Sequence, residues 1–97
     1  MDKTVYRWSE QKAELLKAER GLSFEDIVEA LGNGRLIADI QNPKERFAHQ
    51  RMFIVDLGKH PIVIPYIIEE DGTLFLKTAY PDRKLSKVLK RTKEQDK

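Results

Sequence analysis

Residues 51–80, RMFIVDLGKHPIVIPYIIEEDGTLFLKTAY, contain the strongest strand signals in the chain. They contain three runs rich in β-branched and aromatic residues, at 51–57, 61–69 and 73–80. Runs of this composition predict strands, and Asp71 followed by Gly72 between two of them is a strong hairpin signal. The three runs therefore predict an antiparallel meander, with a bulge or bend at Pro65, because proline cannot donate to the ladder of an interior strand.

Two helices are predicted ahead of this region. Ser9 can cap a first helix that runs to about Arg20. Ser23 and Asp26 have the spacing of a capping box, which predicts a second helix ending near Leu31.

The remaining segments complete the predicted fold. Residues 35–40 resemble a short first strand, 42–50 a polar loop, and 84–93 a helix with an apolar side. We expect a single domain over residues 1–97 of the α+β class. It would have two N-terminal helices, a four-stranded antiparallel sheet and a C-terminal helix.

Composition favours a folded soluble chain. Of the 97 residues, 40% are hydrophobic and 35% charged, as in ordinary globular domains. The chain has no cysteine, which excludes disulfides and thiolate metal sites. The N-terminus is charged, and no segment approaches the roughly 20 apolar residues that span a bilayer. We expect a cytoplasmic protein.

Positive charge is concentrated at the C-terminal end. Residues 83–97 contain seven basic and two acidic residues, a charge of +5, whereas residues 1–82 carry −3 of the total of +2. Such asymmetry is typical of a surface that binds phosphates. A solvated, frayed helix end would have the same composition.

Metal-dependent and nucleotide-dependent enzymes find little support. The histidines, His49 and His60, are eleven residues apart and lie in no metal-binding pattern. The glycines in residues 32–34 follow a predicted helix and precede a strand, the reverse of the order in a phosphate-binding loop. We therefore expect no metal and no cofactor.

RNA cleavage remains possible without either, because RNA carries its own nucleophile. Formation of a 2′,3′-cyclic phosphate needs a base, an acid and cationic donors for the phosphate. The basic and hydroxyl-bearing candidates on strands and their ends are Arg46, His49, Arg51, Tyr66, Lys77, Tyr80, Arg83 and Lys84. Of these, the predicted catalytic residues are His49, Arg51, Lys77, Tyr80 and Arg83. Each has a structural alternative: a solvated loop histidine, a cation at a strand edge, or a tyrosine at the rim of the core.

Several segments together resemble BrnT-family toxins. These are residues 6–12 (YRWSEQK), 19–26 (ERGLSFED), 51–55 (RMFIV) and 75–84 (FLKTAYPDRK). The resemblance implies a RelE-like fold, a metal-independent ribonuclease that blocks translation, and a ribbon-helix-helix antitoxin as partner. By position it implies roles for Lys12, Arg51, Arg83 and Lys84, and also for Glu45 and Arg46. This chain departs from the family in an Ala48-His49-Gln50 insert and in Tyr80-Pro81-Asp82 before the Arg-Lys pair.

The predicted function is thus a ribonuclease toxin. The residues expected to bind flanking RNA are Lys12, Arg46, Lys84, Lys87, Lys90 and Arg91. The alternative is a non-catalytic module that binds nucleic acid or protein through a basic C-terminal helix. In a third interpretation, that helix only packs on the sheet.

Overall fold

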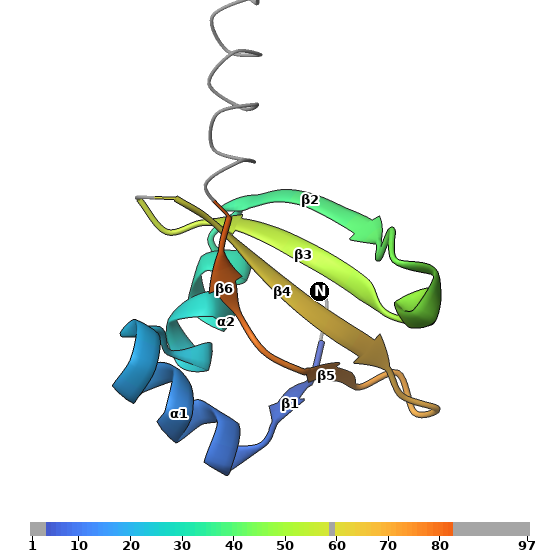
Figure 1. Ribbon diagram of the computed structural model, residues 1–97, viewed down its shortest axis with the longest axis horizontal. Helices are drawn as coiled ribbons and strands as arrows, with labels where there is room; N and C mark the ends of the chain where they lie inside the picture. The colour runs from blue at the N-terminus through green and yellow to red at the C-terminus, as the bar shows by residue number, and fades with distance from the viewer. Residues whose placement is uncertain (1–3, 59, 83–97) are drawn as a thin grey trace, which may run out of the picture.

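The computed structural model describes residues 4–58 and 60–82, and within them the fold is α+β (Figure 1). The helical segments are α1 (Glu10–Arg20), α2 (Phe24–Gly32) and the short 3-10 helix η1 (Glu45–Phe47). The strands are β1 (Tyr6–Trp8), β2 (Leu36–Gln41), β3 (Arg51–Asp56), β4 (Pro61–Ile68), β5 (Leu74–Leu76) and β6 (Tyr80–Pro81). No helix in these residues is long and apolar enough to cross a membrane.

The two α-helices begin and end where the local sequence predicts. The Ser9 side chain accepts a hydrogen bond from the Lys12 N–H at the start of α1, and Gly21 ends that helix with φ 64°. A positive φ is strained for residues with a Cβ, so glycine suits this position. The Ser23 side chain accepts from the Asp26 N–H at 3.2 Å and caps α2.

The predicted antiparallel meander is present, within a larger mixed sheet. The strand order is β1-β5-β4-β3-β2, and β6 pairs with β4. Each neighbouring pair from β2 to β5 is antiparallel, and β1 runs parallel to β5. In the part of the chain that is described, the sheet has six strands.

The prediction of a four-stranded antiparallel sheet with a C-terminal helix was therefore wrong. β1 was missed because its three residues are too few to show an alternating pattern, and its partner β5 is remote in sequence. The run at 73–80 was predicted as one strand but forms both β5 and β6. The helix predicted at 84–93 lies outside the described residues.

Pro65 in β4 explains why residues 73–80 form two strands, β5 and β6, and not one. β4 continues through Pro65 without a break, and the Pro65 carbonyl accepts a hydrogen bond from the Lys77 N–H at 2.8 Å. In an antiparallel strand the N–H and C=O of one residue point to the same side. The N–H that proline lacks is therefore missing on the side of Lys77, where β5 ends. The irregularity expected at Pro65 lies in the neighbouring strand.

Both α-helices pack on one face of the sheet, as Figure 1 shows. Phe24 and Ile27 of α2 contribute fully buried side chains to a core that includes Val55 and Ile64 of the sheet. The opposite face carries a smaller cluster, in which Met52, Ile54 and Val63 are buried and Ala38 and Tyr80 pack against them. Residues that alternate along a strand thus belong to different faces.

Candidate functional site

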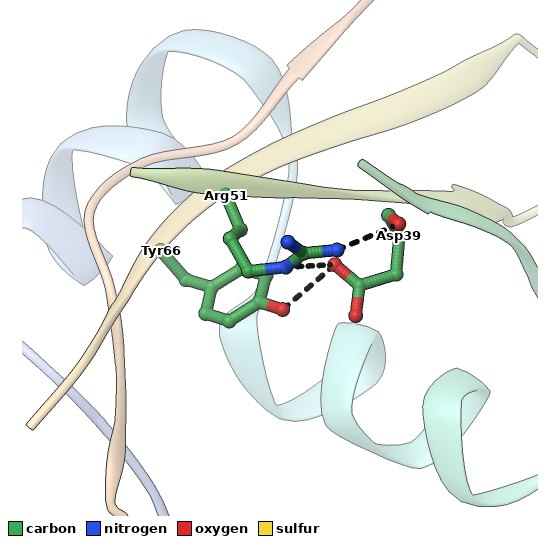
Figure 2. Close-up of polar contacts among 3 residues, drawn as sticks. All are labelled: Asp39, Arg51 and Tyr66. Carbon is green, nitrogen blue, oxygen red and sulfur yellow. Dashed lines mark hydrogen bonds and ion pairs between the residues drawn. The ribbon is translucent and has the colours of Figure 1, made fainter. Parts of the chain in front are cut away.

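Arg51 is held at two points on the helix-covered face of the sheet. Its Nε donates to Oδ1 of Asp39 at 3.1 Å, and its Nη2 donates to the main-chain oxygen of Asp39 at 3.0 Å. The Tyr66 hydroxyl donates to the same Oδ1 at 2.7 Å (Figure 2). Among the described residues, Nη1 of Arg51 has no hydrogen-bond partner. The guanidinium is therefore fixed while one of its nitrogens stays available.

Strand register brings the three side chains together. Arg51 of β3 lies directly opposite Tyr66 of β4, and Asp39 of β2 lies opposite Phe53, two residues further along β3. The rings of Phe53 and Tyr66 stack with centroids 4.0 Å apart and planes 10° from parallel. Tyr66 is only 2% exposed, so its hydroxyl approaches Asp39 from the core.

Arg51 also donates a hydrogen bond to a main-chain carbonyl on the free edge of the sheet. β2 is the last strand in the order, so one side of it has no partner strand in the described structure. The Asn42 N–H donates to Gln50 across the β2–β3 pair, and residues of an antiparallel ladder alternate between bonding their partner and facing away. Asp39, three residues before Asn42, therefore directs its carbonyl toward the free edge. Nη2 of Arg51 occupies that carbonyl.

The protonation states at this site follow from its burial and its hydrogen bonds. Burial, reinforced by the bond to Asp39, raises the pKa of Tyr66 to about 12. The phenol is thus protonated near neutral pH and acts as a hydrogen-bond donor. The Tyr66 hydroxyl, followed by the Asp39 carboxylate, raises the pKa of Arg51 above its ordinary value. Arg51 is therefore a permanent cation.

The loop before β3 adds two further predicted residues at the same end of the sheet. Arg46 lies in η1, is exposed, and has its guanidinium carbon 5.4 Å from the centroid of the Phe47 ring. His49 is exposed and lies two residues before Arg51. Gln41 holds the loop, since its Nε2 donates to the Ala48 carbonyl at 3.0 Å. Two cations and an imidazole therefore belong to one short segment.

Lys77 and Tyr80 lie on the opposite face of the sheet from Arg51. Tyr80 packs against the cluster of Met52, Ile54 and Val63. Lys77 follows β5, with its Nζ 5.4 Å from the centroid of the Phe75 ring, and Phe75 alternates with Leu76, which belongs to the helix-covered core. The structure does not bring these two side chains together with Arg51.

The other predicted residues are distributed as follows. Lys12 lies in the first turns of α1 and is partly exposed. The residues outside the described part of the chain are Arg83, Lys84, Lys87, Lys90 and Arg91.

Asp39 was not predicted as a site residue. It is the only charged residue in β2, whose sequence is LIADIQ, and a carboxylate in an otherwise apolar strand is a usable signal. Its partner Arg51 is twelve residues away, so only the strand register reveals the pair. No group of three or more potential metal ligands occurs in the described residues.

The chain resembles a known protein family. A family model described as "Domain of unknown function (DUF4258)" matches residues 14–81, from within α1 to the end of β6. No curated protein and no solved structure matches the chain.

Proposed function

We propose that this chain, which belongs to the DUF4258 family, is a metal-independent ribonuclease that acts as the toxin of a toxin–antitoxin pair. The observation that carries the proposal is the fixed guanidinium of Arg51, with Nη1 free of partners in the described structure. A preoriented cation of this kind costs little reorganisation when charge develops on a phosphate.

The proposed reaction uses the 2′-hydroxyl of the RNA as nucleophile. As its oxygen bonds the neighbouring phosphorus, its proton passes to a base, and the departing 5′ oxygen receives a proton from an acid. His49 supplies proton transfer, because an imidazole can act as a general base or a general acid and this side chain is exposed two residues from Arg51. Nη1 of Arg51 donates to a phosphate oxygen, and Arg46 binds flanking backbone.

Asp39 and Tyr66 position Arg51 in this proposal. The carboxylate fixes the guanidinium, and the Tyr66 hydroxyl, whose raised pKa keeps it protonated, donates to the same carboxylate oxygen. Tyr66 therefore acts through Asp39 and has no part in proton transfer.

The proposed biological setting comes from the resemblance to BrnT-family toxins. It rests on the four sequence segments noted above, of which residues 19–26 and 51–55 fall entirely within the matched range. The proposed partners are RNA and a ribbon-helix-helix antitoxin. An adjacent short reading frame with a ribbon-helix-helix pattern would support this setting.

A second candidate is a binding module without catalysis. Its support is that two of the three guanidinium nitrogens of Arg51 already bond Asp39, as in a purely structural ion pair. Such a module would bind RNA with strong salt dependence and leave it intact.

The experiment that separates the two candidates measures RNA cleavage in EDTA. We expect wild-type protein to cleave, and Arg51→Ala to lower the rate by about 10²–10³-fold, as does loss of a donor that stabilises developing charge. His49→Ala should also be slow, and because His49 is exposed in a loop, its loss leaves the fold intact. Lys44→Ala removes an equally exposed cation and is the matched control. Intact RNA with wild-type protein that binds RNA would favour the non-catalytic module.

A further inference from the structure

A cleft of about 680 Å³ lies at the other end of the sheet from Arg51. Its lining comes from the end of α1, from α2, from the residue before β2, from the turn between β3 and β4, and from β4 and β6. Leu57, one of its lining residues, directly follows β3 and is six residues beyond Arg51, or about 20 Å at the rise of a strand. The cleft is therefore separate from the Arg51 site, and its volume falls in the range of about 300–1,000 Å³ that is typical of small-molecule sites.

The walls of the cleft carry opposite charges. Asp26 and Glu29 are three residues apart on α2 and both line the cleft, because that spacing places side chains on one face of a helix. Arg20, Arg35 and His60 line it from α1 and from the strand ends. A ligand that binds both the basic and the acidic residues of the cleft needs an anionic group and hydrogen-bond donors.

Two of the basic residues are well placed to meet an anion. Arg20 is anchored, since its Nη1 donates to the Ala79 carbonyl at 2.9 Å, and its other nitrogens have no hydrogen-bond partner among the described residues. Arg35 is held through its backbone alone: its N–H donates to Ala30 and its carbonyl accepts from Asp56. Its exposed side chain is free to bind at the mouth of the cleft.

The cleft also has apolar lining side chains, which include Leu22, Leu57 and Ile62. A flat ring can rest on such side chains. From these apolar side chains, the two acidic residues of α2 and the two arginines, we infer that the cleft binds one nucleotide unit. The phosphate meets Arg20 and Arg35, and the carboxylates accept hydrogen bonds from an exocyclic amino group of the base, as acidic side chains do with cytosine.

This inference rests on the proposed function for the source of the nucleotide, an RNA chain. The recognition chemistry predicts a base preference, because uracil has no exocyclic amino group and leaves Asp26 and Glu29 without donors. Cytidine and adenosine monophosphates should bind more tightly than uridine monophosphate.

The test is NMR titration of the full chain with the three mononucleotides. We expect shift changes at the cleft residues, with cytidine monophosphate preferred to uridine monophosphate. Arg35→Ala should weaken binding about tenfold or more, the usual effect of losing a charge-assisted hydrogen bond. Glu29→Gln should reduce the preference for cytidine monophosphate. Lys44→Ala, which lies outside the cleft lining, should change neither result.

A second arm identifies the source of the nucleotide. An oligoribonucleotide methylated at its 2′ oxygens cannot be cleaved by attack of those oxygens. If this oligoribonucleotide binds in the cleft more tightly than the mononucleotides do, the result supports RNA as the ligand. Equal or weaker binding of the oligomer supports a free nucleotide as the ligand of the cleft.

Absence of shift changes at the cleft with every nucleotide, or changes that Arg35→Ala leaves intact, would overturn the inference. RNA cleavage in EDTA is scored separately, so the proposed function can fail while the cleft still binds nucleotide, or the reverse.

Discussion

The Tyr66 hydroxyl and Nε of Arg51 both donate a hydrogen bond to Oδ1 of Asp39. The two donors differ in exposure: the Arg51 side chain is 41% exposed, and Tyr66 is 2% exposed. Exposed ion pairs contribute about 0–1 kcal/mol to stability, whereas loss of a partly buried hydrogen bond to a charged group costs more. The Tyr66 bond is therefore the main stabilising contact of the three.

Replacing Tyr66 with phenylalanine tests that assignment. We expect Tyr66→Phe to lower the free energy of unfolding by about 1.5–3 kcal/mol, because it removes the bond to the carboxylate and leaves the ring stacked on Phe53. Urea denaturation measures the change. Tyr80→Phe is the control, since Tyr80 has no hydroxyl partner in the described residues, and its effect should be small. Equal losses in both variants would contradict the account.

The raised pKa of Tyr66 also predicts a pH dependence of stability. A tyrosine in the unfolded chain ionises near pH 10, whereas Tyr66 in the fold ionises at about 12. Because the folded state holds its proton more tightly, the associated stability is fully present below about pH 10 and is lost as the pH rises toward 12. The stability difference between wild type and Tyr66→Phe should be constant below pH 10 and shrink above it. A difference that stays constant to pH 12 would show that the Tyr66 pKa is not raised.

The exposed edge of β2 is bonded by the Arg51 side chain. β2 is an edge strand with Leu36, Ile37 and Ile40 each 41% exposed, and such edges are prone to pair with other chains. Nη2 of Arg51 occupies the Asp39 carbonyl on this edge. Arg51 thus protects the strand in addition to any role with RNA.

Arg51→Ala should therefore increase self-association. The substitution frees a carbonyl at the centre of an apolar edge strand, and we expect larger species to appear with rising concentration in sedimentation velocity. His49→Ala leaves the edge contact in place and should sediment as wild type does. A monodisperse Arg51→Ala protein at every concentration would show that the bond to Asp39 does not guard the edge. The same data also reveal whether a cleavage defect in Arg51→Ala reflects association.

Elements with strong local signals were predicted from the sequence, and those defined by distant contacts were not. Ser9 and Ser23 cap their helices as expected, because a cap depends on residues within one turn. β1 has three residues and pairs with β5 across most of the chain, so no local pattern reveals it. The break between β5 and β6 follows from Pro65 in the adjacent strand, which only the register shows.

In the folded molecule, the sheet places on different faces residues that were predicted from the sequence to form one site. Arg51 and His49 belong to the end of the sheet where β3 begins, whereas Tyr80 and Lys77 lie on the opposite face. Residue type alone predicted all four as one site, because alternation assigns faces only after the register is known. Arg20, Arg35 and His60 meet at the cleft from three separate segments, a grouping that the sequence order does not indicate.

The chemistry of the RNA ends distinguishes attack by the 2′-hydroxyl from every other outcome. Wild-type protein is incubated with a defined single-stranded RNA in EDTA, and the new 3′ ends are identified by mass spectrometry. The proposed attack by the 2′-hydroxyl predicts a 2′,3′-cyclic phosphate on one product and a free 5′-hydroxyl on the other. Products ending in a 3′-hydroxyl and a 5′-phosphate, or RNA that remains intact, would contradict it.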